Sequence, residues 1–303
     1  MTLPLFLLPN MAYAADVATR LDAIDGRVVC EEDYVSTWLT TTKNQWQMLG
    51  GSAFTVLQTL NKSEETLFGC DGLIALHDPS LDLYKLMLFE AKVLKPIGMD
   101  RAQSKATPRA IWSYNTPPPP AHSHFADQLG RQHWWKTVAN ELSIIEFFID
   151  LRPPAPPFTA ANGFLEYGST CVLHELARNL VTPSGYPNPP YTVASPTIAE
   201  NGIWTENTVI PLPEKASIRS ALWNLSKCKF GKPMHHPDGL KGILIDLMQR
   251  QHPDPRGNQG INPTGENLRL TGQLPDILQA AGIRFFAQFS GQSPPSWLHA
   301  IDG

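Results

Sequence analysis

The sequence predicts an α/β fold, and three observations support this class. Stretches whose apolar residues recur at helical spacing alternate with short, strongly apolar stretches typical of strands. Hydrophobic residues make up 42% of the 303 residues, which is enough for a large core. The surplus of prolines, 28 in all, falls mostly between these stretches or after them, as expected for connecting loops.

The first half of the chain has the clearest pattern. Residues 32–60 carry apolar and aromatic residues at helical spacing, interrupted by Gly50 and Gly51, and predict one helix or two helices that meet at these glycines. Two apolar stretches follow, and the turn residues Asp78-Pro79-Ser80 between them predict a hairpin of strands. The second stretch is so apolar that we expect its strand to be central in the sheet.

A proline-rich loop then leads to a helix and a strand. The four prolines Pro117 to Pro120 exclude helix and interior strand, and Ser123 is a candidate N-cap for the helix that follows. Residues 143–151 include six apolar residues, five of them between 144 and 149, and predict a strand, which must end at the extended segment 152–157. The order helix, strand, strand, helix, strand predicts a compact α/β core over residues 31–152.

Residues 153–303 form a loop-rich, partly helical region, either packed on the same domain or separate from it. We expect helices over about residues 161–180, 214–225 and 240–251, separated by a proline-punctuated stretch from Pro183 to Pro213 and by a Gly/Asn/Pro loop. Residues 274–289 predict a final helix and strand. That last strand is a candidate for an additional strand of the core sheet.

Residues 1–30 are expected to form an apolar N-terminal arm. Ala12-Tyr13-Ala14 resembles a signal-peptidase site, but no Lys or Arg precedes the apolar residues, so an arm packed on the domain is favoured over a secretory signal. No stretch reaches the roughly 18 apolar residues that cross a bilayer, so no membrane partner is expected. The four cysteines form no CxxC pair, which favours buried thiols in a reducing, cytoplasmic compartment over a zinc ribbon or redox dithiol.

The charge balance excludes a globally basic nucleic-acid-binding protein. Lys and Arg number 24 against 28 Asp and Glu, a formal net charge of −4, so any phosphate-binding surface must be local. Basic residues exceed acidic ones from Lys85 to Arg109 and from Lys227 to Arg256. The second excess is explained equally well by solvated loops.

Asp71, Glu90 and Lys92 form the candidate site. Side chains two apart on a strand share a face, so Glu90 and Lys92 project together and Ala91 points away. Asp71 would face Glu90 from the paired strand. Two carboxylates provide the hard oxygen ligands that Mg²⁺ prefers, and an adjacent lysine can orient or activate a water molecule.

This pattern resembles the signature of the PD-(D/E)XK nuclease superfamily, an acidic residue on one strand and Glu-X-Lys on the next. Glu90 follows Asp71 after 19 positions, and Gln128 matches the glutamine of a Gln-x-x-x-Tyr motif found in several branches, although Gln132 replaces the tyrosine. The resemblance covers residues 31–152 and includes the order of elements. It implies a restriction-endonuclease-like core, with a central mixed sheet flanked by helices.

The resemblance also implies an enzyme, a Mg²⁺-dependent nuclease that hydrolyses DNA phosphodiester bonds in restriction, repair or other DNA processing, with Mn²⁺ as a possible substitute. Asp71, Glu90 and the Ala91 carbonyl would hold the cation, Lys92 would orient or activate water, and Gln128 would position the site. Residues expected to contact phosphate are Arg131, Lys95 and His124.

Several alternatives remain open at this point. Glu64 or Glu65, just before the first strand, and Glu31 and Glu32, near the first helix, are candidates for a further metal ligand, although acidic residues are also expected near a helix N-terminus. Glu90 and Lys92 would otherwise be an ordinary ion pair at a strand end. The sequence lacks the Gly-x-Ser-x-Gly elbow of serine hydrolases and the glycine loop of nucleotide-binding proteins, so these two classes are disfavoured. The main rival is therefore a nuclease-like fold that serves as a non-catalytic binding or assembly module. The sequence does not decide substrate specificity or oligomeric state.

Overall fold

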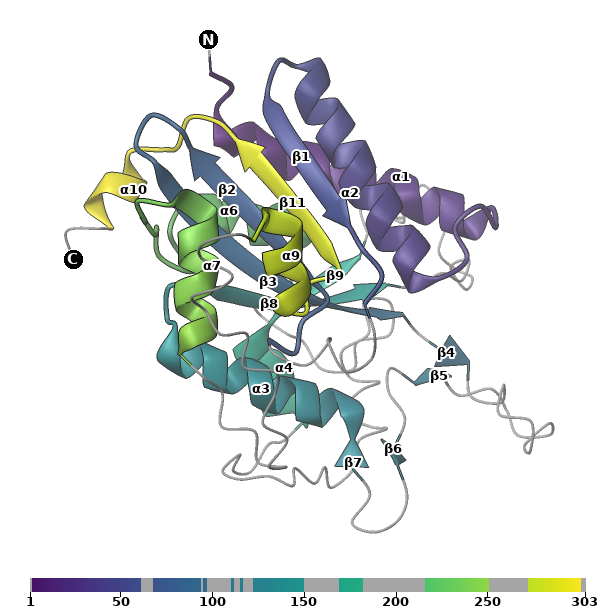
Figure 1. Cartoon of the computed structure of the whole chain (residues 1–303). Coiled ribbons are helices and arrows are strands. Elements are labelled where there is room, and N and C mark those ends of the chain that lie inside the picture. Colours follow the sequence, from purple (N-terminus) through teal and green to yellow (C-terminus); the bar gives the residue numbers. More distant parts are fainter. Residues whose placement is uncertain are drawn as a thin grey trace, which may run out of the picture.

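The computed structural model describes residues 2–60, 68–93, 95–96, 110–111, 115–116, 122–149, 169–181, 216–250 and 272–300. Within these ranges seven strands form one sheet in the order β1-β11-β2-β3-β8-β9-β10 (Figure 1). The pairs β11/β2 and β3/β8 are parallel and the other neighbours are antiparallel. The predicted α/β class, with a mixed sheet flanked by helices, is therefore confirmed.

The element bounds are as follows. The strands of the sheet are β1 (Ser52–Leu57), β2 (Gly72–Asp78), β3 (Leu83–Val93), β8 (Ser143–Ile149), β9 (Thr170–Leu173), β10 (Ala216–Ser217) and β11 (Phe285–Ser290). The helices are η1 (Leu5–Leu7), α1 (Leu8–Ile24), α2 (Glu31–Met48), α3 (His124–Val138), α4 (His174–Val181), α6 (Ile218–Ser226), α7 (Gly239–Gln249), α9 (Leu274–Ala280) and α10 (Ser296–His299). Two short ladders pair β4 (Lys95–Pro96) with β5 (Ala110–Ile111) and β6 (Asn115–Thr116) with β7 (His122–Ser123).

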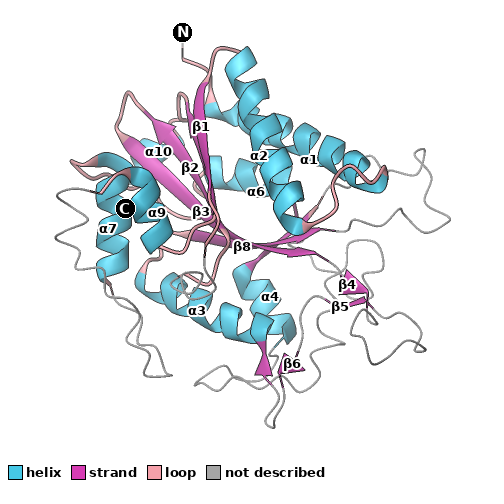
Figure 2. Ribbon diagram, turned by 45° about the vertical axis from the view of Figure 1, so that its right-hand side comes forward, coloured by secondary structure: helices cyan, strands magenta, loops and turns pink. Residues whose placement is uncertain are grey.

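Helices cover both faces of the sheet (Figure 2). Helices α1, α2 and α6 enclose one hydrophobic cluster, which includes Met87 and Phe89 of β3. Helices α3, α7 and α9 enclose the other, which includes Leu86 and Leu88. The two-residue alternation along β3 therefore sends Glu90 and Lys92 to the α3 face and Ala91 to the α2 face.

The N-terminal arm packs on the domain as expected, in the form of helix α1. Leu5 and Leu8 are fully buried, and Asp16 lies buried between α2 and the start of β9. The Tyr34 hydroxyl donates to Asp16 Oδ1 at 2.8 Å, and the Ser169 amide donates to Oδ2 at 2.6 Å. Burial raises the pKa of Asp16 despite these bonds. No described helix is both long and apolar enough to span a membrane.

Two predicted helical segments are strands instead. The second half of the predicted 32–60 helix is β1, because α2 ends before Gly50, whose φ is +89°, and Ser52–Leu57 pairs antiparallel with β11. The predicted 161–180 helix is described from residue 169 onward, and Thr170–Leu173 pairs antiparallel with β8 before α4 begins at His174. In both cases pairing with a distant strand overrides the local pattern.

Other predicted elements are confirmed. The hairpin is β2/β3, β3 lies between β2 and β8, and the helix and strand that follow are α3 and β8. The predicted 214–225 and 240–251 helices are α6 and α7, which begin at Ile218 and Gly239. The final pair is α9 and β11, and β11 joins the same sheet between β1 and β2. The proline segments 117–120, 152–157 and 183–213 lie outside the described residues.

Candidate active site

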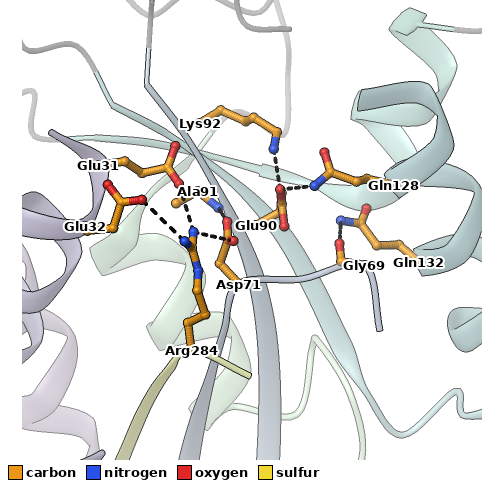
Figure 3. Close-up of polar contacts among 10 residues, drawn as sticks. All are labelled: Glu31, Glu32, Gly69, Asp71, Glu90, Ala91, Lys92, Gln128, Gln132 and Arg284. Atoms are coloured by element: carbon orange, nitrogen blue, oxygen red, sulfur yellow. Dashed lines mark hydrogen bonds and ion pairs between the residues drawn. The ribbon is translucent and has the colours of Figure 1, made fainter. Parts of the chain in front are cut away.

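Strand register brings Asp71 and Glu90 together. Gly72 of β2 pairs with Phe89 of β3, which places Asp71 opposite Glu90. The Asp71 amide donates to the Phe89 carbonyl at 3.0 Å, and Asp71 Oδ2 accepts from the Ala91 amide at 2.8 Å (Figure 3). Asp71 is thus fixed by both its backbone and its carboxylate at the point where β2 begins.

Glu90 is held by a lysine from its own strand and a glutamine from α3. Both Lys92 Nζ and Gln128 Nε2 donate to Glu90 Oε1 (Figure 3). Glu90 is only 1% exposed, and its Oε2 has no hydrogen-bond partner within the described ranges. Burial and the charge of Asp71 raise the pKa of Glu90 well above its usual value, although Lys92 acts in the opposite direction. Gln128 therefore contacts the predicted glutamate, as the sequence pattern implied.

Lys92 retains its positive charge at neutral pH. Burial lowers its pKa, but the carboxylates of Glu90, Asp71 and Glu31 outweigh this effect and leave the pKa above its ordinary value. The side chain points across the α3 face toward Glu90 (Figure 3). An ammonium group in this position can donate hydrogen bonds to water or phosphate, but it is not a proton acceptor.

The structure adds Arg284, which the sequence did not indicate. It directly precedes β11, and because β11 runs parallel to β2 with Phe285 beside Gly72, Arg284 lies beside Asp71. Its Nη2 is 2.9 Å from Asp71 Oδ1, and its amide donates to the Asp71 carbonyl at 2.8 Å. Predicting this residue from the sequence would have required knowing that β11 pairs with β2.

Glu31 and Glu32, at the start of α2, complete this side of the site. Arg284 Nη2 is 3.5 Å from Glu31 Oε1, and Nη1 is 3.3 Å from Glu32 Oε1. Burial and the charge of Asp71 raise the pKa of Glu31 to about 7, against the opposing effects of Lys92 and Arg284. Glu31 and Glu32, suggested by the sequence, therefore lie at the site, paired with an arginine, whereas Glu64 and Glu65 lie outside the described residues.

Behind Glu90, a buried polar network connects α3 to the turn that carries Asp71. Gln132 Nε2 donates to the Gly69 carbonyl at 2.8 Å, and its Oε1 lies 3.0 Å from His174 Nδ1. Gln132 thus occupies the place of the tyrosine in the resembled motif and anchors the Asp71 turn. Glu146 of β8 pairs in register with Glu90, is fully buried, and has its pKa raised to about 8 by burial.

The structure describes only one of the three side chains predicted to contact phosphate. Arg131 is partly buried on α3, and its Cβ lies near Gly69. Lys95 and His124 belong to β4 and α3, and their side chains lie outside the described part of the chain. The prediction that Lys85 belongs to a basic surface is wrong. Lys85 is fully buried on the face of the sheet opposite Glu90 and Lys92, and its Nζ lies 6.0 Å from the Trp297 ring centroid.

The donor set fits a single hard cation that keeps much of its water. Among the described residues no three His, Cys, Asp or Glu side chains form a metal-binding group. Asp71 and Glu90 nevertheless lie opposite each other in the strand register, and the charge of Asp71 acts on Glu90. Glu90 Oε2 is a buried acceptor without a hydrogen-bond partner among the described residues. Mg²⁺ is commonly held by only one or two carboxylates, so this pair is sufficient for it.

Comparison with protein-family models, curated proteins and solved structures finds no match for this chain.

Proposed function

We propose that the chain is a metal-dependent nuclease that hydrolyses phosphodiester bonds in DNA, built on a restriction-endonuclease-like core. The observation that carries this proposal is the convergence of Asp71, Glu90, Lys92 and Gln128, from two paired strands and one helix. Burying two carboxylates and a lysine costs folding free energy, and their pairing offsets only part of that cost. A catalytic requirement explains why the sequence keeps them.

Each side chain has a distinct part in the proposed reaction. Asp71, Glu90 and the Ala91 carbonyl would hold Mg²⁺, and the bound cation would supply Lewis-acid stabilisation of charge on the phosphate. The Lys92 ammonium orients the attacking water and steadies charge on the phosphate oxygens. Gln128 fixes the Glu90 carboxylate through its hydrogen bond to Oε1. Gln132 fixes the turn that precedes Asp71.

The rival function is a non-catalytic binding or assembly module. One observation favours it: the Arg284 guanidinium already pairs with Asp71, as a permanent substitute for the cation would. A module of this kind would bind DNA or a protein without cleaving it. Cleavage assays separate the two functions directly.

The test compares wild type with Lys92→Ala, Glu90→Gln and Arg27→Ala on linear, circular and single-stranded DNA, with Mg²⁺, Mn²⁺ or EDTA. We expect wild type and Arg27→Ala to cleave only with a divalent cation, because Arg27 is exposed, pairs with Asp22 and Asp25, and lies outside the site and both basic clusters. Lys92→Ala and Glu90→Gln should lose at least about 100-fold in rate, as for other positioned charge-stabilising groups.

Stability measurements distinguish a catalytic loss from misfolding. Glu90→Gln keeps the shape of the side chain but removes the carboxylate that pairs with the buried Lys92 ammonium, so this variant should lose stability, and its unfolding curve must show that it is still folded under the assay conditions. Equal cleavage by wild type and Lys92→Ala, or no cleavage by wild type with either cation, would contradict the nuclease proposal. DNA binding without cleavage would support the module instead.

A further inference from the structure

Arg284 occupies the middle of the acidic side of the site. Its guanidinium lies 2.9 Å from Asp71 Oδ1, 3.3 Å from Glu32 Oε1 and 3.5 Å from Glu31 Oε1 (Figure 3). Only 16% of its side chain is exposed. The guanidinium therefore pairs with three carboxylates from two separate elements, and the Lys92 ammonium adds a second positive charge that acts on Glu31.

The sheet fixes the backbone of Arg284 but not its guanidinium group. The amides of Arg284 and Phe285 both donate to the Asp71 carbonyl, at 2.8 and 3.1 Å. These bonds belong to the backbone and do not depend on the side chain. The guanidinium itself is held by charge and by the Phe285 ring, whose centroid is 5.3 Å from Cζ. Its long side chain can change rotamer without disturbing β11.

We propose that Arg284 takes the place of the divalent cation at Asp71 in the metal-free protein, and that it turns to a phosphate of the bound nucleic acid when the cation binds. This inference rests on the proposed function. Asp71 Oδ1 cannot be fully available to a metal ion while Arg284 donates to it, so the two cations compete for the same oxygen. A guanidinium released beside the metal is well suited to phosphate, which it can bind through two parallel hydrogen bonds.

Two consequences follow for binding. Removing the positive charge of Arg284 should tighten binding of a divalent cation, because the competitor is lost and the site becomes more negative. The same change should weaken binding of DNA in the presence of the cation, because a phosphate contact is lost. Because the loss of any positive charge near the site would act in these same two directions, the response of the Arg284 side chain itself to the cation is the readout that identifies its specific role.

The experiment titrates Mn²⁺ alone into the purified full chain by isothermal titration calorimetry, for wild type, Arg284→Gln and Arg284→Lys. We expect Arg284→Gln to bind Mn²⁺ roughly tenfold more tightly than wild type, as the loss of one charge-assisted contact predicts. Arg284→Lys, which keeps the charge, should remain closer to wild type. Arg27→Gln is the matched control, since Arg27 is an exposed arginine paired with Asp22 and Asp25 away from the site.

A second titration measures a short DNA duplex by fluorescence anisotropy with Ca²⁺ in place of Mg²⁺, which is intended to limit cleavage. Arg284→Gln should bind the duplex roughly tenfold more weakly than wild type, and Arg27→Gln should not differ. A third readout is measured on wild type: addition of Mg²⁺ should shift the Nε–H resonance of Arg284 in a ¹⁵N-arginine spectrum. Arg284→Lys serves only to assign this resonance.

Unchanged or weaker Mn²⁺ binding by Arg284→Gln would overturn the inference, as would an Arg284 resonance that does not respond to Mg²⁺. If Arg284→Gln does not fold, the resonance measurement alone decides. The nuclease proposal can fail separately from this inference. If wild type does not cleave DNA but Arg284→Gln still binds Mn²⁺ more tightly, the nuclease proposal is refuted and the competition between Arg284 and the cation is supported. Cleavage by wild type with no change in Mn²⁺ affinity would remove only the role of Arg284.

Discussion

Replacing Lys85 with methionine is expected to stabilise the protein at neutral pH. Lys85 is fully buried on β3, and its Nζ has no hydrogen-bond partner in the described part of the chain. Burial lowers its pKa from 10.5 to about 8, although the neighbouring Cys228 acts in the opposite direction. Each tenfold change in proton affinity corresponds to about 1.4 kcal/mol, so the charged lysine costs about 3 kcal/mol of folding free energy.

The sign of the pH dependence follows from linkage. Below pH 8 the lysine is protonated in both folded and unfolded chains, and the full cost is present. Between pH 8 and 10.5 the unfolded chain binds more protons than the folded chain, so the stability of wild type rises with pH. Methionine keeps the length and apolar stem of lysine without the charge. The advantage of Lys85→Met should therefore be about 2–3 kcal/mol at pH 7 and should disappear above pH 10.5.

Urea unfolding followed by tryptophan fluorescence measures this difference, since Trp38, Trp46, Trp135 and Trp297 are all buried. Lys229→Met is the control, because an exposed lysine should give little change at any pH. A less stable Lys85→Met variant at pH 7 would refute the reasoning. A stabilisation that does not change with pH would show that packing, rather than the buried charge, is responsible.

Two further substitutions test the packing around the site. Gly72→Ala would place a methyl group against the buried Phe89 ring, which is 1% exposed, and should lower the free energy of unfolding in urea by about 1–3 kcal/mol. The double variant with Phe89→Leu should recover much of this stability. If the stability losses of the two substitutions simply add, the contact between the two residues is contradicted. Gln132→Leu removes the partner of the Gly69 carbonyl and of His174, and should cost about 2 kcal/mol while also slowing DNA cleavage. Full activity in a destabilised Gln132→Leu variant would show that the network supports the fold but not the site.

The sequence predicted the parts of the site that depend on local pattern. The alternation along β3 was sufficient to place Glu90 and Lys92 on one face, and the apolar stripe of α3 placed Gln128 on a helix that follows. Each of these predictions needed only neighbouring residues. The same holds for the hairpin, whose turn residues and paired apolar strands lie within one short segment.

The parts that failed depend on pairing between distant residues. Ser52–Leu57 has a helical pattern by itself, but it forms a strand because β11, more than 200 residues later, pairs with it. Arg284 belongs to the site for the same reason, since only the parallel register of β11 with β2 sets it beside Asp71. Propensity carries no information about such partners, so neither feature was accessible from the local sequence.

The position of β11 also has a consequence for how the chain becomes functional. Because β11 separates β1 from β2, the segment 31–152 alone would lack the only described strand that pairs with β1, and the facing edge of β2 would be unpaired. A ribosome must therefore have completed residue 290 before the sheet can close, and contacts of such long sequence separation are expected to form slowly. Expression of residues 31–152 alone should give an aggregation-prone product, whereas supplying residues 272–300 as a separate chain offers a way to complete the sheet and to deliver Arg284 to the site.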